Sequence, residues 1–435
     1  MEQAKKITGE VEIPQSIVKD IQEKVRNISD LKKKIQASFE KTTTELLSIV
    51  LAGAINLDAS DIHIEPEEKQ ARNRIRADGI LQDVLLFDLK IHKALVSRVK
   101  LLSKLKLNVT DRPQDGRFSI LLGATPIEIR ASSLPAEYGE SIVLRILNPK
   151  NLINVEALGL REDLSKIFNK EIKKPNGMIL VTGPTGSGKT TTLYAILKKL
   201  NRPEVKIITI EDPIEYHLKG ISQTQVDSKK GYDFAKGLRS MMRQDPDIVL
   251  VGEIRDFETA KIGLQAALTG HLVLSTLHTN DAAGTIARLQ ALGEKANNIA
   301  PAINIAIAQR LVRKVCKKCV EFKKASSEDL EKIKKALKGL SKEIKIPELT
   351  TSIKIPQAKG CKECNSFGYK GRIGIFEFFL NDSDMEKFIL TSPSISSMKD
   401  LAIKKGMVLM RQDGFIKVLE GTTTIEEIER VAAEK

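Results

Sequence analysis

The stretch Gly183-Pro184-Thr185-Gly186-Ser187-Gly188-Lys189-Thr190 decides the fold of this chain. It fits the pattern G-x-x-x-x-G-K-[ST], with an apolar run at 178–181 before it and a helix-forming run that starts at Thr191 after it. In such a strand–loop–helix unit, backbone N–H groups and the positive end of the helix converge on phosphate groups. The Lys189 ammonium can reach the outer phosphates, and the Thr190 hydroxyl can ligate Mg²⁺. A Gly-rich turn that matches by chance is the alternative, but the flanking strand and helix favour a phosphate site from Gly183 to Thr191.

The chain beyond about residue 155 alternates helices with short apolar strands. That pattern is typical of a parallel sheet covered on both faces, so we predict the α/β fold class. The strands are expected at 178–182, 205–210, 248–251 and 272–276. Open α/β sheets bind ligands at the carboxyl ends of their strands. Residues that can bind a ligand or take part in catalysis follow each of these four strands.

Carboxylate and imidazole side chains stand at these strand ends. Glu211, the first residue of Glu211-Asp212-Pro213-Ile214-Glu215, can hold Mg²⁺ through water or orient an attacking water, although acidic residues also simply cap loops. Glu253 follows a Walker-B-like strand and is expected near the Mg²⁺ water shell. His271 and His278 bracket the last predicted strand, where an imidazole can donate a hydrogen bond to a γ-phosphate. For each of the two histidines, the simpler alternative is a core residue whose hydrogen bonds are satisfied within the protein.

The N-terminal third has a different pattern. Apolar residues at three- and four-residue steps from Val18 to Ile35 predict one amphipathic helix that begins near Pro14, packed on its own protein or docked on a partner. Further helices are expected at 42–55, 91–107 and 328–340, and short strands at 62–64, 72–76, 117–120, 127–130 and 141–147. The expected divisions are a helical or flexible segment at 1–44, a small α+β domain at 45–150 and a P-loop domain at 151–435, which includes a zinc-binding lobe at about 312–375 and a helical part at about 383–435.

Composition excludes several classes of protein. No stretch approaches 18 consecutive apolar residues and no secretory signal is visible, so we expect a protein made and kept in the cytosol. Aromatic residues make up 4% with no Trp, which disfavours stacking on single-stranded bases. Residues 310–375 hold 18 Lys/Arg and 7 Asp/Glu, a surplus of +11 out of the net +14. This basic segment suits an anionic lipid surface, an acidic partner or nucleic acid, unless it is only a solvated lysine-rich face.

The four cysteines form two C-x-x-C pairs, at Cys316 and Cys319 and at Cys361 and Cys364. Two such pairs with no cysteine left over fit a tetrahedral Cys₄ zinc site in a reducing compartment, where disulfides are disfavoured. Redox catalysis would need one pair on a thioredoxin-like unit, which the pattern does not show.

Several motifs in this order resemble the type II secretion and type IV pilus-assembly ATPase family over about residues 45–430. They are Ser60-Asp61-Ile62-His63-Ile64-Glu65, Arg112-Pro113-Gln114-Asp115-Gly116-Arg117, Gly183–Thr190, Glu211–Glu215, Asp247–Arg255, the strand between His271 and His278, Gln309–Arg313, the two cysteine pairs, Gly368–Arg372 and Met410–Gly414. The tetracysteine motif resembles the assembly and secretion members, since retraction motors of pili typically lack it.

This resemblance implies a hexameric ATP hydrolase with a PAS-like α+β domain and a RecA-like P-loop domain. ATP would bind between the two, and their closure would move a membrane platform protein at the cytoplasmic face of the inner membrane. It also implies that Glu211 polarises the attacking water, that Glu253 supports Mg²⁺ and that His278, perhaps with His271, senses the γ-phosphate. The positive charges that stabilise the transition state would come from Arg117, Arg130, Arg239 and Arg243.

Two other functions remain open. A basic P-loop protein can be a nucleic-acid motor, such as a helicase or a DNA-uptake ATPase, although the clustering of positive charge and the scarcity of aromatics disfavour nucleic acid as a partner. The second open function is that of a scaffold that binds nucleotide without hydrolysing it. Evidence against it is the presence of all four residues expected for hydrolysis, Lys189, Thr190, Glu211 and Glu253.

Overall fold

The computed structural model describes residues 9–123 and 125–433. Residues 1–8, the start of the segment expected to be helical or flexible, lie outside the described residues. The contacts divide the chain into two compact units. The first contains the described residues up to Asn151, Cys316–Cys319 and Lys359–Lys370, and the second contains Leu152–Val315, Val320–Ala358 and the residues from Gly371 onward. Among the described helices, none combines the length and the hydropathy needed to cross a bilayer.

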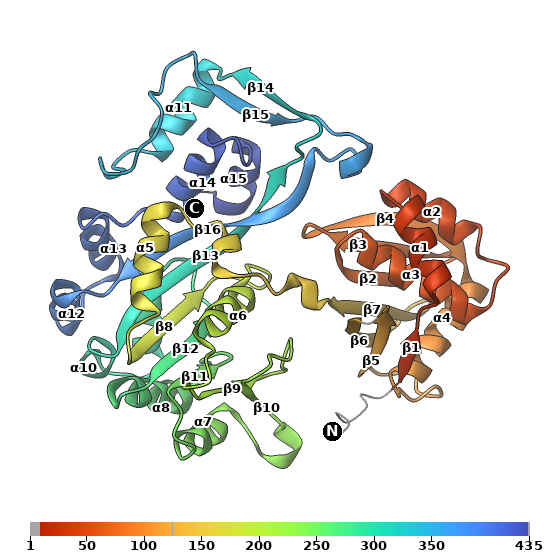
Figure 1. The fold of residues 1–435 in the computed structure, drawn as a ribbon, viewed down its shortest axis with the longest axis horizontal. Coiled ribbons are helices and arrows are strands. Elements are labelled where there is room, and N and C mark those ends of the chain that lie inside the picture. Colours follow the sequence, from red (N-terminus) through yellow and green to blue (C-terminus); the bar gives the residue numbers. More distant parts are fainter. Residues whose placement is uncertain (1–8, 124, 434–435) are drawn as a thin grey trace. The chain divides into compact units, whose positions relative to one another are not determined.

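The first unit is a seven-stranded sheet packed on helices (Figure 1), with the strand order β1-β5-β6-β7-β2-β3-β4. Helix α3 is almost entirely buried, and it packs on α1, α2, α4 and β2. The elements are β1 (Glu10–Glu12), α1 (Gln15–Lys24), α2 (Ile28–Gln36), α3 (Thr43–Asn56), β2 (Ala59–Pro66), β3 (Gln70–Ala77), β4 (Ile80–Asp88), α4 (Leu89–Leu102), β5 (Gln114–Leu122), β6 (Thr125–Ala136) and β7 (Gly139–Leu147).

The prediction of one continuous helix from Pro14 to Ile35 was wrong. The chain forms α1 and α2 with a break at residues 25–27, although the apolar residues of both helices are buried as their spacing predicts. The Asn27 side chain accepts a hydrogen bond from the Asp30 N–H at 2.9 Å and so caps a new helix. The helix expected at 91–107 is α4, which begins and ends earlier.

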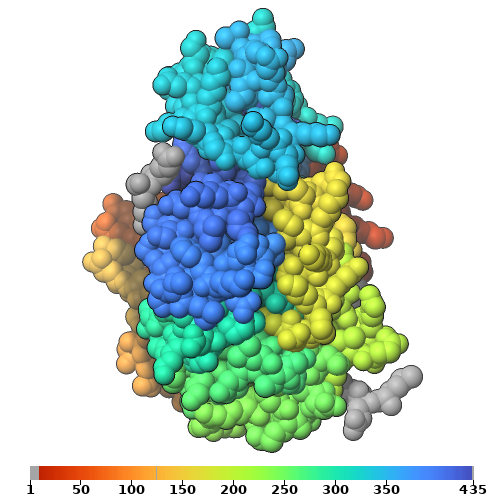
Figure 2. Space-filling model, turned by 90° about the vertical axis from the view of Figure 1, so that its left-hand side faces the viewer, coloured from red at the N-terminus to blue at the C-terminus, as the bar shows by residue number. Residues whose placement is uncertain are grey.

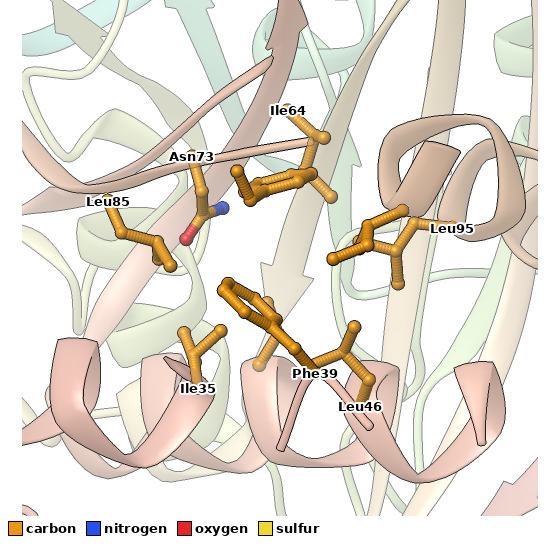
Figure 3. A pocket seen from close by; sticks show the side chains of 10 residues that line it. Ile35, Phe39, Leu46, Ile64, Asn73, Leu85 and Leu95 are labelled. Carbon is orange, nitrogen blue, oxygen red and sulfur yellow. The ribbon is translucent and has the colours of Figure 1, made fainter. Parts of the chain in front are cut away.

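A small cavity lies in the core of the first unit, with a volume of about 10 Å³, room for about one water. Its walls are apolar side chains of α2, α3, α4, β2 and β4 and of Phe39 between α2 and α3, with Asn73 of β3 as the polar exception (Figure 3). The Asn73 amide nitrogen donates to the His63 carbonyl at 3.2 Å, while its Oδ1 accepts no hydrogen bond within the described part of the chain.

The second unit confirms the predicted α/β sheet. Its seven strands follow the order β10-β9-β11-β12-β8-β13-β16, and the pairs β9–β10, β9–β11, β11–β12, β12–β8 and β8–β13 are all parallel. The strands are β8 (Gly177–Thr182), β9 (Ile207–Glu211), β10 (Ser222–Gln225), β11 (Ile248–Val251), β12 (Leu272–Leu277), β13 (Ile303–Val315) and β16 (Tyr369–Leu380). The four predicted strands are therefore present, and their ends differ from the predicted ones by at most two residues.

Helices cover both faces of this sheet. Alternate residues of β8 belong to different cores: Ile179 and Val181 pack with α5 and α6, whereas Met178 and Leu180 pack with helices that follow β11. The helices are α5 (Glu162–Glu171), α6 (Lys189–Leu200), α7 (Phe234–Met242), α8 (Phe257–Leu268), α9 (Gly284–Ala291), α10 (Ala296–Ile299), α12 (Ser383–Leu390), α13 (Ile395–Lys404), α14 (Met410–Leu419) and α15 (Ile425–Ala432). A smaller two-stranded sheet, β14 (Val320–Lys324) and β15 (Lys354–Ala358), flanks α11 (Ser327–Ala336), the helix expected at 328–340.

A buried ion pair fastens α5 to the C-terminal helices, whose surfaces adjoin in Figure 2. The Arg161 guanidinium, which precedes α5, donates to the Asp413 carboxylate of α14 and also to Asp163 at 2.8 Å. Asp413 has no exposed surface and accepts a further hydrogen bond from the Phe376 N–H at 2.8 Å. The pair thus joins the start of α5, β16 and α14.

We expect Asp413→Ala to destabilise the second unit by about 3–5 kcal/mol, because the buried Arg161 guanidinium would lose its fully buried partner and keep only the exposed Asp163. Asp163→Ala is the matched control, since it removes the exposed partner of the same guanidinium and should cost less than about 1 kcal/mol. Urea unfolding followed by circular dichroism measures both values. Equal effects of the two changes would contradict this account of the pair.

Candidate functional site

The predicted phosphate loop connects β8 to α6, as its sequence indicates. Gly183 has φ +146°, and a Cβ at this position would lie 2.4 Å from the Gln309 carbonyl oxygen. Gly188 has φ +88° and stands immediately before the first turn of α6. Only glycine adopts these backbone angles without strain, so the two residues let the loop curl over the amino end of α6.

The loop fits a phosphate group. The Lys189 ammonium donates to the carbonyls of Gly183 at 2.8 Å and Pro184 at 3.2 Å, so its donors already lie inside the loop. Burial lowers the pKa of Lys189, and the negative charge of Glu253 opposes that shift. The Ser187 hydroxyl is buried and has no hydrogen-bond partner in the described ranges. A polar atom orphaned in this way, beside an ammonium at a helix N-terminus, suits an anionic ligand.

Glu211 is the last residue of β9 rather than a loop residue, and only 4% of its surface is exposed. Its Oε2 accepts a hydrogen bond from the Tyr194 hydroxyl, and its Oε1 accepts from Thr209 Oγ1 at 2.7 Å and Gln223 Nε2 at 3.2 Å. Burial raises the pKa of Glu211, while the three donors act in the opposite direction. Glu211 is therefore a buried carboxylate held by uncharged donors.

Glu253 has a different environment, although it follows the neighbouring strand β11. It forms an ion pair with Arg255, and its Oε2 lies 3.8 Å from His278 Nε2. Its side chain is 15% exposed and that of His278 is 53% exposed. Burial lowers the pKa of His278, with the charge of Lys189 as the next cause. The structure thus brings Lys189, Glu253 and His278 together at the carboxyl edge of the sheet.

His271 is not part of this group. It precedes β12, and its Nδ1 lies 3.1 Å from the Ala266 carbonyl. β12 runs parallel to β8, with Leu272 opposite Gly177 and Leu277 opposite Thr182. His271 and His278 therefore lie at opposite ends of a six-residue strand, which spans about 20 Å.

The predicted arginines lie in two places. Arg239 on α7 pairs with Glu258 of α8, and Arg243 donates to the Arg239 carbonyl at 3.3 Å. Arg117 and Arg130 belong to the first compact unit, where β5 and β6 place them directly opposite each other. Both lie near the Glu128 carboxylate, at 4.0 Å and 3.6 Å.

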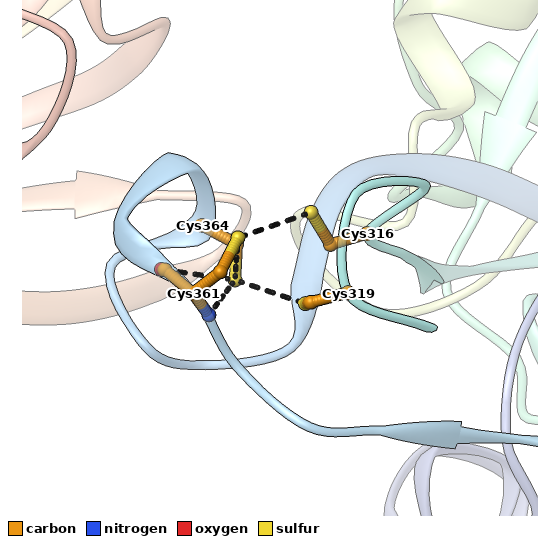
Figure 4. A group of neighbouring side chains, drawn as sticks. All are labelled: Cys316, Cys319, Cys361 and Cys364. Carbon is orange, nitrogen blue, oxygen red and sulfur yellow. Dashed lines mark hydrogen bonds between the residues drawn. The ribbon is translucent and has the colours of Figure 1, made fainter. Parts of the chain in front are cut away.

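The four cysteines form one cluster in the first compact unit (Figure 4). Their sulfur atoms all lie within 4.8 Å of one another, and no cysteine is in a disulfide. The Sγ–Sγ distances are 3.9 Å for Cys316–Cys361, 3.7 Å for Cys319–Cys364 and 3.8 Å for Cys361–Cys364. Thiolates at about 2.3 Å from a tetrahedral Zn²⁺ lie about 3.8 Å apart, so the cluster has the size of a metal site.

Comparison with known proteins decides the family. Residues 36–430 match the family described as type II/IV secretion system protein. The chain belongs to this family. The chain is 45% identical over 391 residues to "Type II secretion system protein E" of Pseudomonas aeruginosa, covering 90% of the chain and 75% of the relative. It is also 40% identical over 408 residues to "Type IV pilus assembly ATPase PilB" of Myxococcus xanthus, covering 93% and 70%.

Solved structures show a similar fold. The chain is similar to the pilus retraction motor PilT with bound ADP, with a TM-score of 0.59 at 26% identity over 88% of the chain and 95% of PilT. The Legionella pneumophila ATPase DotB has the same fold, with a TM-score of 0.65 at 21% identity over 90% of the chain and 96% of DotB. The family match and the two relatives confirm the resemblance inferred from the sequence motifs.

Sequence reasoning missed the groups that hold Glu211. Tyr194, Thr209 and Gln223 belong to α6, β9 and β10, and two of them are distant from Glu211 along the chain. One signal was available for Tyr194. It lies on the buried face of the helix that follows the phosphate loop, where a tyrosine hydroxyl needs a partner.

Proposed function

We propose that this chain is an ATP hydrolase that drives type II secretion or type IV pilus assembly by moving its two compact units relative to each other. The relatives named for secretion and for pilus assembly support this function. The observation that carries the proposal is the shared edge of the parallel sheet, where the phosphate loop meets Glu211, Glu253 and His278.

The residues at this edge would divide the work. Lys189 and the backbone N–H groups of the loop Gly183–Thr190, other than Pro184, would hold the outer phosphates of ATP. The Thr190 hydroxyl and Glu253, directly or through water, would hold Mg²⁺, which neutralises phosphate charge. His278, beside Glu253, can donate a hydrogen bond to the γ-phosphate.

Glu211 would orient the attacking water. An ionised carboxylate offers about four acceptor positions, and three protein donors occupy three of them. The remaining position lies on Oε2 and can accept one hydrogen bond from a water molecule. A base fixed in this way needs little reorganisation during hydrolysis.

Four arginines would supply the positive charge that stabilises the transition state. Arg117 and Arg130 would supply it from the first unit, and Arg239 and Arg243 from the second. Positive groups at the transferring phosphoryl group stabilise the charge that develops there.

The proposal extends to assembly and location. We infer a homo-hexamer in the cytoplasm, bound peripherally to the inner membrane through a platform protein. The basic segment 310–375 suits an anionic lipid surface at that site. Nucleic acid is not expected as a partner, and a steep, salt-dependent stimulation of hydrolysis by DNA would contradict that expectation.

We also propose that the cysteine cluster binds Zn²⁺. Four thiolates with no carboxylate or imidazole in the cluster form a ligand set that zinc occupies in structural sites. Such a site closes the two cysteine pairs into one rigid lobe and leaves no open position for catalysis.

Metal analysis of the purified protein should find about one zinc ion per chain. Cys361→Ser should lose it, because three thiolates and a hydroxyl bind zinc much more weakly. Lys318→Ala is the control, since it changes an exposed residue between two cysteines without removing a ligand. Full zinc content in Cys361→Ser, or a wild-type protein that is completely folded without metal, would refute the site.

Lys189→Ala should bind ATP at least tenfold more weakly, because the charge-assisted hydrogen bonds from Lys189 to the phosphates are lost. Titration with a fluorescent ATP analogue measures the affinity. Lys198→Ala, on the exposed side of the same helix, should bind like the wild type. Unchanged affinity and full secretion or piliation with Lys189→Ala would favour a scaffold over a motor.

Glu211→Gln should bind ATP but release phosphate about tenfold more slowly or worse, since the oriented carboxylate is lost. Glu204→Gln, an exposed change before β9, is the matched control and should keep normal turnover. If Glu211→Gln hydrolyses ATP at the wild-type rate, Glu211 has no part in the mechanism.

A further inference from the structure

Tyr194 connects two parts of the proposed active site. It lies on α6, the helix that begins with Lys189 and Thr190, and it is 2% exposed. Its hydroxyl donates a hydrogen bond to Glu211 Oε2, and its ring packs edge-on against Tyr216 with the ring centroids 6.1 Å apart. A single side chain therefore joins the phosphate-binding helix to the carboxylate at the end of β9.

The three hydrogen-bond donors reach the two carboxylate oxygens of Glu211 from different elements. Tyr194 approaches Oε2 from α6, whereas Thr209 and Gln223 approach Oε1 from β9 and β10. Thr209 is fully buried, so water does not compete for its hydrogen bond. Of the three donors, only Tyr194 belongs to an element that also carries phosphate ligands.

We propose that Tyr194 is a positioning residue for hydrolysis: its hydroxyl fixes the Glu211 carboxylate relative to the helix that binds the phosphates. This inference rests on the proposed role of Glu211. A shift of the amino end of α6 on phosphate binding moves Tyr194 with it, and the hydrogen bond transmits that shift to the carboxylate. The water molecule held at the remaining acceptor position of Oε2 then stays aligned with the phosphate as the helix moves.

A purely structural role is the competing explanation, because a buried tyrosine hydroxyl must find some acceptor. The two explanations differ in their consequences. A structural role predicts lower stability with normal catalysis. A positioning role predicts a change in the chemistry and in its pH dependence, with stability affected or not.

The pH dependence follows from the groups that face Glu211. Tyr194 comes from α6, Thr209 from β9 and Gln223 from β10, and the nearby charge of Glu215 opposes ionisation. The Tyr194 hydrogen bond favours the ionised carboxylate and lowers the pKa of Glu211. Removing this donor raises that pKa, so activity that needs the carboxylate is lost at a higher pH as the solution is acidified.

The test is Tyr194→Phe in the full-length protein, with phosphate release measured across pH. The ring and its packing remain, and only the hydroxyl is lost. We expect kcat to fall about tenfold, the factor that one hydrogen bond to a charged group represents. The KM for ATP should change less than twofold, and the acidic limb of kcat/KM should move to higher pH. Tyr232→Phe is the matched control, since its hydroxyl pairs with Thr224 at 3.2 Å, and it should leave all three quantities unchanged.

A double-mutant cycle with Glu211→Gln separates this inference from the proposed function. If Tyr194 acts through Glu211, Tyr194→Phe has no further effect on kcat in the Glu211→Gln background. If Glu211→Gln hydrolyses ATP slowly while Tyr194→Phe has a normal rate and pH profile, only the positioning role of Tyr194 is overturned. A normal Glu211→Gln overturns the role of Glu211 and this inference with it. Should Tyr194→Phe unfold, Thr209→Val removes a second donor to the same carboxylate, and an unshifted acidic limb in that variant refutes the inference.

Discussion

Parallel hydrogen bonding between four neighbouring strands is the constraint on which the site depends. In the order β9, β11, β12 and β8, every pair runs in the same direction, so the carboxyl ends of all four meet at one edge. The register then decides which residues face each other. Val251 opposite Ile210 brings Gly252 beside Glu211, and Leu277 opposite Thr182 brings His278 to the start of the phosphate loop. A slip by one residue would reverse the face of every side chain on the strand that slipped.

A side-chain hydrogen-bond network reinforces this edge. The Thr182 hydroxyl donates to the Leu277 carbonyl at 3.0 Å and accepts from the Thr279 N–H at 2.8 Å. Beneath the loop, Gln309 accepts a hydrogen bond from Thr192 at 2.6 Å, and its backbone lies against Gly183. The last residue of β8, the exit from β12 and the start of α6 are therefore held in one arrangement. A loop supported in this way needs little reordering to receive a phosphate.

Local patterns made the main features predictable from the sequence. The phosphate loop, the four strands and the two cysteine pairs each depend on residues close together in the chain. The single helix expected from Val18 to Ile35 failed for a related reason: its periodicity was correct, but the cap at Asn27 starts a second helix. His271 was expected beside the γ-phosphate only together with His278, and it lies at the amino end of β12, away from the edge that carries the phosphate loop. The donors to Glu211 could not be predicted, since their meeting depends on strand order and on the height of α6 above the sheet.

The two acidic side chains of the site illustrate how one sheet edge supports two chemical roles. Glu253 lies among basic side chains: Arg255 is paired to it, Lys189 lies nearby, and the imidazole of His278, whose pKa burial lowers, is 3.8 Å away. The positive charges of Arg255 and Lys189 largely balance its charge, and phosphate ligands or Mg²⁺ can displace them. Glu211 lies one strand away and is surrounded by hydroxyl and amide donors, with burial pushing its pKa upward. A carboxylate whose pKa is raised by burial is suited to accept a proton from water, whereas one among displaceable cations is suited to a metal shell. Because the neighbours of each carboxylate come from different elements, the division of roles depends on the packing of α6 and β10 against the sheet and on the segments that follow β11 and β12.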